Sequence, residues 1–411
     1  MTEQMNVPKL RFGEFEGAWS SHRINDVSEC VTSGSRDWAK YYSNKGDKFV
    51  RMTNLGREGI NLLLEDMRYV SIPKGGSEGQ RTSLQENDIL ISITAELGKI
   101  GIIPQGFGTA YINQHTALVR VNQQVNARFL AQNLATKKSN KKINRLNDSG
   151  AKSGLNLSTI RNYEFTAPTT LPEQQKIASF LSKVDEKIGL LSEKKDKLTE
   201  YKRGVMQQLF NGKWHEQDGQ LTFMPPTLRF KADDGSEFPD WEEKKVSDIF
   251  EVTRGKVLAV PKMSEGQTND YKYPVYSSQT KSNGLTGYYT EFLFSDAITW
   301  TTDGANAGDV KYREGEFYCT NVCGVLLSTK NANICMAELL NRVTHKYVSY
   351  VGNPKLMNGT MGDIKIPLPC VQEQAKIANF LSTIVQKIDL ANSELDKAKE
   401  WKKGLLQQMF V

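Results

Sequence analysis

The chain has 411 residues, of which 38% are hydrophobic and 24% are charged, as in a folded protein with two or three domains. A formal net charge of +6 permits an anionic partner such as nucleic acid without requiring one. No window approaches 18 apolar residues, so we expect no signal peptide, no membrane span and a cytoplasmic location. The five cysteines lack paired C-x-x-C spacing, which indicates reduced thiols and argues against zinc.

The first 170 residues predict a globular domain of short strands and turns. A short segment at its start carries Leu10, Arg11, Phe12 and Trp19. Runs rich in β-branched residues predict strands at 49–52, 89–93 and 116–121. Residues 127–135 then predict a short helix, which leads into a basic run at 137–142.

Residues 172–210 predict one long helix. Apolar residues recur at alternating steps of four and three, which gives a heptad seam over about five heptads. The seam residues are Ile177, Leu181, Val184, Ile188, Leu191 and Leu198. Pro172 is tolerated because its missing N–H costs nothing in the first turn. At about 1.5 Å per residue the helix spans roughly 57 Å, more than a compact domain needs, so we expect a coiled coil.

The second half of the chain repeats this plan. Between 173–210 and 373–410, 19 of 38 positions are identical without a gap, which is an internal duplication. The second seam consists of Ile377, Leu381, Ile384, Ile388 and Leu395. The opening segment also recurs, as Leu228, Arg229, Phe230 and Trp241. Lys202 and Lys402 interrupt the two seams at equivalent positions, where polar residues fix register and partner orientation.

The second globular domain predicts strands at 297–301 and 322–327 and a helix at 337–350. A shift of 207 residues sets Ile91 on Ile298 and Leu118 on Val325, so the two domains are divergent copies of one fold. The expected fold class is α+β, with two α/β domains in tandem joined by two long helices. The predicted divisions are a first domain at 1–170, a helix at 171–211, a linker and docking segment at 212–239, a second domain at 240–369 and a helix at 370–411.

Two short motifs imitate catalytic signatures. Residues 75–79 fit the G-x-S-x-G pattern of hydrolases but lie in a polar turn without a strand-to-helix context. Residues 239–244 contain pieces of metal-dependent nuclease motifs, yet the pieces are contiguous and the twin segment lacks the acids, which favours docking. The four histidines have no metal-ligand spacing, and no P-loop or dinucleotide pattern occurs. We expect a non-catalytic protein without a metal or cofactor of its own.

Turns rich in Lys, Arg, Asn, Gln, Ser and Thr interleave with aromatic residues in both domains. Asn and Gln can pair with adenine, Arg and Lys with guanine, and Ser or Thr with phosphate or base edges. Merely solvated turns would have the same composition. The candidate DNA-binding residues are Arg36, Lys40, Tyr42, Arg51, Lys99, Gln114 and His115 in the first domain, and Gln279, Lys281, Asn283, Trp300, Thr301, Thr302, Asn306 and Lys311 in the second.

Together these features resemble the specificity subunit of type I restriction-modification systems. Residues 171–181, Leu-Pro-Glu-Gln-Gln-Lys-Ile-Ala-Ser-Phe-Leu, resemble the opening of the family's long helix, and both helices end in Gly-x-x-Gln-Gln-x-Phe. The second helix departs from this pattern, because Val371-Gln372 stands where the first has Leu171-Pro172. The run at 298–304 also resembles one kind of target-recognition domain.

The resemblance implies a mechanism. The helices would pack antiparallel and act as a ruler between two target-recognition domains related by a pseudo-twofold axis. Each domain would read a few base pairs of double-stranded DNA, so the target would be bipartite and asymmetric. Two methyltransferase subunits would bind S-adenosylmethionine and methylate adenine N6, and restriction or translocase subunits would use ATP and Mg²⁺. The chain itself would bind no cofactor and no membrane.

Two alternatives come from other classes of protein. A coiled-coil adaptor would bind proteins only. After its basic turns were neutralised, its interactions would be insensitive to DNA and to salt. A repressor-like protein would bind its DNA site tightly without a methyltransferase. The target sequence itself cannot be read from the recognition turns.

Overall fold

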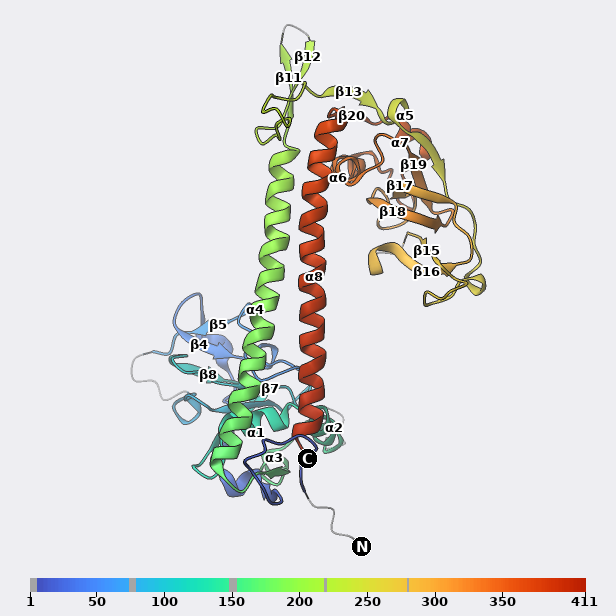
Figure 1. Ribbon diagram of the computed structural model, residues 1–411. Coiled ribbons are helices and arrows are strands. Elements are labelled where there is room, and N and C mark those ends of the chain that lie inside the picture. The colour runs from blue at the N-terminus through green and yellow to red at the C-terminus, as the bar shows by residue number, and fades with distance from the viewer. Residues whose placement is uncertain (1–5, 74–78, 148–153, 218–219, 279–280) are drawn as a thin grey trace. The chain divides into compact units, whose positions relative to one another are not determined.

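The computed structural model describes residues 6–73, 79–147, 154–217, 220–278 and 281–411 (Figure 1). Contacts between Cα atoms divide the chain into two compact units. The first consists of residues 1–192 and 393–411, and the second consists of residues 193–392. Each unit therefore contains the first part of one long helix and the last part of the other.

The first unit has a mixed fold. Its strands are β1 (Ser20–Arg23), β2 (Ser28–Ser33), β3 (Tyr42–Ser43), β4 (Asp47–Val50), β5 (Arg68–Val70), β6 (Ile89–Ser92), β7 (Ile100–Ile102), β8 (Ala110–Ile112), β9 (Thr116–Val121) and β10 (Glu164–Ala167). Its short helices are α1 (Ala127–Leu134), α2 (Lys137–Arg145) and α3 (Leu157–Arg161), and α4 (Leu171–Leu209) begins in this unit. The sheets have the orders β2-β9-β6-β7, β3-β5-β4-β8 and β1-β10.

The second unit opens with a hairpin. Its strands are β11 (Lys213–Gln217), β12 (Gln220–Met224), β13 (Glu242–Lys245), β14 (Glu251–Arg254), β15 (Tyr273–Tyr276), β16 (Leu285–Tyr289), β17 (Phe294–Thr301), β18 (Val310–Cys319), β19 (Cys323–Leu327) and β20 (Lys365–Leu368). Its helices are α5 (Val246–Ile249), α6 (Ile334–Asn341), α7 (Asn358–Asp363) and the start of α8 (Val371–Met409). The main sheet has the order β14-β19-β17-β18-β15-β16. The Gly- and Pro-containing stretch after α4 thus forms the β11–β12 hairpin.

The two units share one topology. The order β2-β9-β6 in the first corresponds to β14-β19-β17 in the second. β4 pairs in parallel with β8 and antiparallel with β5, as β15 does with β18 and β16. The long β18 corresponds to β7 and β8, between which residues 103–109 leave the strand. The duplication predicted from sequence is therefore a duplication of fold, and Ile91 and Ile298 lie in the equivalent strands β6 and β17.

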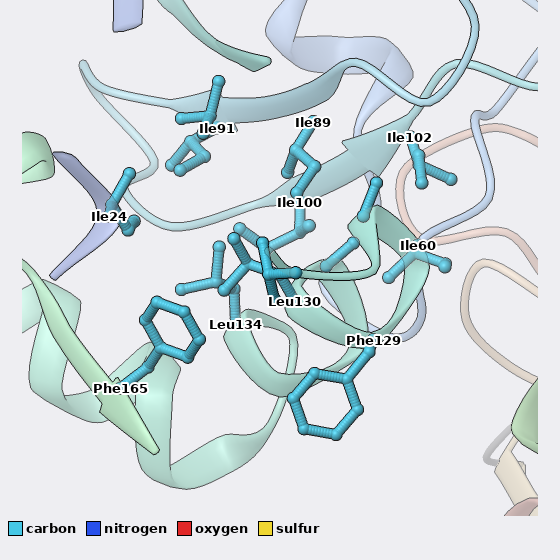
Figure 2. Packing of buried hydrophobic residues seen from close by; sticks show 14 of the residues in the cluster. Ile24, Ile60, Ile89, Ile91, Ile100, Ile102, Phe129, Leu130, Leu134 and Phe165 are labelled. Atoms are coloured by element: carbon cyan, nitrogen blue, oxygen red, sulfur yellow. The ribbon is translucent and has the colours of Figure 1, made fainter. Parts of the chain in front are cut away.

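The core of the first unit lies on both faces of its central strand. Ile89 and Ile91 point to the side covered by α1, where they join a cluster with Leu130 and Leu134 (Figure 2). Leu90 points to the other side and joins a second cluster. Successive side chains alternate between the faces of a strand, so a strand buried on both faces is continuously apolar.

The two long helices pair antiparallel within each unit. In the first unit the start of α4 meets the end of α8: Phe180 packs edge-on against Trp401, and Asp185 pairs with Lys402 at 2.5 Å. In the second unit the start of α8 shares a cluster with Leu209 at the end of α4. The six seam residues of α4 and the five of α8 are all buried or half-buried.

Both lysines that interrupt the seams have carboxylate partners. Lys402 pairs with Asp185, and Lys202 donates to Glu338 of α6 at 3.0 Å. All four side chains are largely removed from solvent. Each lysine therefore has its charge paired within its own unit. This agrees with a role for the two lysines in fixing the register of the helices.

Two elements end earlier than the sequence predicts. The predicted helix at 337–350 is α6, which ends at Asn341, followed by a 3-10 turn at Thr344–Tyr347. Here the hydroxyl of Thr344 donates to the carbonyl of Gly308, so a tertiary contact competes with the helix. The predicted strand at 49–52 is β4, which ends at Val50 because the amide of Asn54 closes a 3-10 turn on Arg51. The predictions at these two ends were wrong.

Candidate nucleic-acid interface

A buried glutamate at the start of each long helix fixes the repeated opening segments. Arg11 donates from Nε and Nη2 to the two carboxylate oxygens of Glu173, both at 2.8 Å, and the indole of Trp19 donates to the same carboxylate at 3.3 Å. Two charge-assisted bonds in a fork are the strongest arrangement for such a pair. The hydrogen bond to Glu173 raises the pKa of Arg11.

The second unit repeats this arrangement with other residue numbers. Arg229 donates to Glu373 from Nε at 2.9 Å and from Nη2 at 2.7 Å, and Trp241 donates from its indole at 2.9 Å. The hydrogen bond to Glu373 raises the pKa of Arg229. Because Trp241 belongs to the motif at 239–244, this geometry gives that motif a docking role.

The glutamine that follows each glutamate fixes the globular part of the unit. The side chain of Gln174 accepts from the backbone N–H of Asn126, and the side chain of Gln374 accepts from the amide of Asn333, at 2.8 and 3.0 Å. Asn126 caps the N-terminus of α1, and Asn333 caps that of α6. The Glu-Gln pair at the start of each long helix thus contacts both the repeated opening segment and the helix α1 or α6 of the same unit.

The first unit has a hollow of about 570 Å³ where three strands end. Residues that follow β4, β6 and β8 line this hollow, namely Arg51, Met52, Thr53, Thr94, Ala95, Asn113 and His115. Two of the predicted candidates, Arg51 and His115, therefore lie together, although 63 residues of sequence separate them. A third candidate, Gln114, bonds to His115.

Hydrogen bonds fix the orientation of the polar side chains in this hollow. The amide nitrogen of Gln114 lies 3.0 Å from Nε2 of His115, and Thr94 Oγ1 lies 2.8 Å from Nδ1. The amide nitrogen can only donate, so Nε2 accepts and Nδ1 donates its proton to Thr94. Arg51 donates from Nη2 to the carboxylate of Asp66 at 2.5 Å and to its backbone carbonyl at 2.9 Å. The guanidinium of Arg51 is thereby held in place.

The remaining candidates of the first unit lie outside the lining of the hollow. Arg36 is exposed and follows Ser35, whose carbonyl accepts from the backbone N–H of Gln114. Lys40 lies 4.9 Å from the ring of Tyr41, and Tyr42 is exposed. Lys99 pairs with Glu96 and lowers the pKa of that carboxyl group.

The second unit has a much smaller cleft, of about 10 Å³, near the equivalent strand ends. Ser277 follows β15, Thr301 ends β17, and Cys323 begins β19 after its turn with β18. Ser277 and Thr301 correspond to the positions that follow β4 and β6 in the first unit, whereas Cys323 corresponds to the start of β9. The full lining is Ser277, Gly284, Thr299, Trp300, Thr301, Asp309, Lys311, Arg313 and Cys323. The predicted candidates Thr301 and Lys311 thus lie in one cleft.

Three candidates of the second unit are buried, namely Trp300, Thr301 and Thr302, and Thr301 is only 9% exposed. The indole of Trp300 is 1% exposed and donates to the carbonyl of Leu356, so it is part of the core. Thr302 is fully buried, and its hydroxyl donates to the carbonyl of Val322. Neither the Trp300 nor the Thr302 side chain is accessible to a base in this structure, so neither is part of the candidate interface.

The last candidates lie in the surrounding turns. Asn306 is half-buried in the turn after β17, and Asn283 is exposed in the turn before β16 with a left-handed backbone, φ 56°. Gln279 lies outside the described residues, and for Lys281 only the backbone is described. The hydrolase-like motif at 75–79 also falls almost entirely outside them.

Arg313 lines the second cleft and was not among the sequence candidates. Its side chain donates from Nε to the hydroxyl of Thr299 at 3.1 Å and from Nη1 to the carbonyl of Asn283 at 2.9 Å, and its guanidinium lies 3.8 Å from the ring centre of Tyr276. Burial lowers the pKa of Arg313, and burial together with Arg313 lowers that of Lys311. The alternation of Lys311 and Arg313 along β18 was the signal available in the sequence.

The described side chains that line the two sites include several hydrogen-bond donors and acceptors. Within the part of the chain that the structure describes, no group of three histidine, cysteine or acidic side chains could hold a metal ion. No described helix is long and apolar enough to cross a membrane. The polar groups that line the two sites are hydrogen-bond donors and acceptors of the kinds that read base edges or phosphates.

The chain is similar to known proteins over most of its length. A family model described as "Type I restriction modification DNA specificity domain" matches residues 16–200 and 239–400. A Mycoplasma pneumoniae protein named as the N-terminus of a type I specificity subunit is 40% identical over 144 residues, which are 34% of this chain and 75% of that protein. A Methanocaldococcus jannaschii protein named as a type I restriction enzyme specificity subunit is 22% identical over 436 residues, 100% of this chain and 96% of that protein.

The fold is also that of a solved structure. The crystal structure of a type I restriction-modification S subunit from M. genitalium has a TM-score of 0.69 with this chain. The match covers 98% of this chain and 99% of the other, at 16% sequence identity. At this identity the likeness concerns the fold alone.

Proposed function

The chain is a DNA specificity subunit of the type I restriction-modification family, and from that premise we propose that each of its units reads one half of a bipartite, asymmetric target in double-stranded DNA. The observation that carries this proposal is the pair of sites at equivalent strand ends. One is lined by Arg51, Asn113 and His115, and the other by Ser277, Asp309 and Lys311. The same place in one fold thus carries different hydrogen-bonding groups, as two different half-sites require.

The long helices would set the distance between the two half-sites. A helix of 39 residues is about 58 Å long at 1.5 Å per residue, whereas one turn of B-DNA is about 34–36 Å. Such a spacer can hold two readers over separate segments of one duplex. The DNA between those segments would remain unread.

We propose that the chain works with two methyltransferase subunits and with restriction or translocase subunits. The methyltransferases would hold S-adenosylmethionine, flip an adenine out of each half-site and methylate N6. The restriction subunits would use ATP and Mg²⁺. This chain would recognise the target sequence and hold the other subunits, without a catalytic residue of its own. It would act in the cytoplasm. The matches do not favour the adaptor or the repressor considered above.

Methylation mapping tests the proposal. The full chain is co-expressed with its methyltransferase subunit, and the host DNA is sequenced by a long-read method that detects N6-methyladenine. We expect a single bipartite motif with one methylated adenine in each half. Replacing residues 20–170 with the corresponding region of a relative should change one half only. A soluble complex that leaves no motif would contradict the proposal.

A further inference from the structure

Helix α2 is strongly basic. Its nine residues, Lys137–Arg145, include five cations and no acid. The cations are Lys137, Lys138, Lys141, Lys142 and Arg145, and all of them are exposed. Like charges four positions apart, as in Lys137 and Lys141, destabilise a helix. The first turn also carries lysines where the helix dipole disfavours them.

The helix nevertheless has a fixed place in the first unit. The hydroxyl of Thr136 caps its N-terminus, and Ile143 is buried on its inner side. Asn140 and Asn144 donate to the carbonyls of Gly98 and Leu97, at 2.8 and 3.4 Å. These contacts attach α2 to the turn that follows β6. The beginning of the same turn, at 94–95, lines the first hollow.

Along its outer side α2 borders a broad basic groove of about 680 Å³. The lining residues are Arg57, Ala135, Lys137, Asn140, Lys141, Asn144 and Arg145. Four of these seven side chains are cations, and no carboxylate is among them. Glu96 lies near one edge, 3.9 Å from Arg57, and both side chains of that pair are about half-exposed. The positive field of the groove is therefore largely uncompensated by its own lining.

Among the described residues that follow α6 in the second unit, none form an equivalent helix. After α6 the chain makes only the 3-10 turn at Thr344–Tyr347, in which His345 lies 3.4 Å from Asp309. The basic helix is therefore an addition to one copy of a duplicated fold. Because only one copy of the fold has this helix, the fold itself does not require it.

We propose that α2 and Arg57 bind the phosphate backbone of duplex DNA beside the segment read by the first hollow. This inference rests on the proposed function. Duplex DNA is favoured because the groove carries a row of exposed cations, and because α2 is attached to the turn that lines the hollow. Phosphate contacts of this kind position a protein on the duplex without reading its sequence. They release counterions, so they make binding more dependent on salt.

The test compares two variants of the full chain in complex with its methyltransferase subunits. The first variant carries Lys137→Gln, Lys141→Gln and Arg145→Gln. The control carries Lys9→Gln, Arg23→Gln and Arg81→Gln, which remove the same charge from exposed positions of the first unit outside both sites. Binding to a fluorescent duplex with the methylated motif, and to a scrambled duplex, is measured by anisotropy over a series of salt concentrations.

We expect the slope of log K against log salt concentration to fall in magnitude by about 2.7 for the α2 variant, at about 0.9 per phosphate contact. Affinity for the two duplexes should fall by the same factor, the methylated motif should not change, and the control should bind like the wild type. The single variant Lys141→Gln should lower the slope by about 0.9 if the triple variant does not fold.

Three results would overturn the inference. They are an unchanged slope, a changed methylation motif, and loss of complex formation by the α2 variant with intact folding. The last would mean that α2 meets an acidic surface of a partner protein. If the wild-type complex binds no duplex at all, the proposed function itself fails, so the two failures are distinguishable.

Discussion

Replacing Glu373 with alanine removes the acceptor at the centre of the second docking site. The carboxylate is fully buried, and it receives two hydrogen bonds from Arg229 and one from Trp241. The Arg229 side chain is only 12% exposed, so after the substitution this nearly buried charge would keep only a longer contact, at 3.7 Å, with the exposed carboxylate of Asp240. Breaking a buried pair in this way costs about 3–5 kcal/mol, which is roughly a 10²- to 10⁴-fold change in the unfolding equilibrium.

Chemical denaturation followed by tryptophan fluorescence measures this cost for the chain as a whole, because Trp241 is one of six tryptophans that contribute to the signal. Hydrogen exchange over residues 228–245 shows whether the docking segment is released before the rest of the unit unfolds. The matched control is Glu193→Ala on α4. That glutamate pairs with Lys197 at an exposed position, so its loss should cost no more than about 0.5 kcal/mol. If the two variants lost equal stability, the buried docking site would not hold the segment as described.

Three further outcomes follow from other parts of the structure. Leu181→Ala in the α4 seam should cost about 2–5 kcal/mol in a thermal or chemical unfolding assay, whereas Leu190→Ala, at a position 60% exposed, should stay within about 0.5 kcal/mol; equal losses would place the seam elsewhere. Asp66→Asn removes the charged partner of Arg51 but keeps its bond to the backbone carbonyl, so it should weaken methylation by about two- to fivefold, at the first unit's half-site only. Equal loss at both halves would contradict this. Burial raises the pKa of Cys323 to about 11, so its alkylation at pH 8, followed by mass spectrometry, should be at least about 100-fold slower in the folded chain than in the unfolded chain. Similar rates would show that this thiol is accessible.

The long helices were predictable because their signal is local and repeated. A heptad pattern needs only the spacing of apolar residues along one segment, and two copies of it confirm each other. The predicted span 172–210 differs from α4 by one residue at each end. Pro172 lies in the first turn, where its missing N–H removes no hydrogen bond. The antiparallel pairing came from a family resemblance and not from spacing, because a seam alone does not give direction.

The two candidate sites were only partly predictable because their linings depend on strand register. Trp300 was a candidate for DNA contact, but it pairs across the sheet with Gly324, and a side chain at that glycine would overlap the indole ring. The tryptophan therefore fills the space that the glycine leaves. Nothing in either segment alone indicates that they are neighbours. Arg313 was missed for the same reason, since its contact with Thr299 depends on the pairing of β17 with β18.

The positions that are identical in the two long helices indicate which contacts both helices must make. Of the ten positions 173–182, eight are identical in 373–382, a density well above that of the remaining helix. The seam alone does not require this, because a coiled coil accepts many apolar residues at each position. The buried Glu-Gln pair does require it, because each side chain meets groups of fixed geometry in two other segments. The glutamate bonds to an arginine and a tryptophan. The glutamine bonds to the asparagine that caps α1 in the first unit or α6 in the second. A globular domain could therefore change its strand-end residues freely while these three partners stayed. Gln174 meets the backbone N–H of Asn126, which any residue except proline supplies, whereas Gln374 meets the side-chain amide of Asn333. A working exchange of the second domain should therefore supply an asparagine at the position of Asn333, and a chimera that loses it should fold poorly.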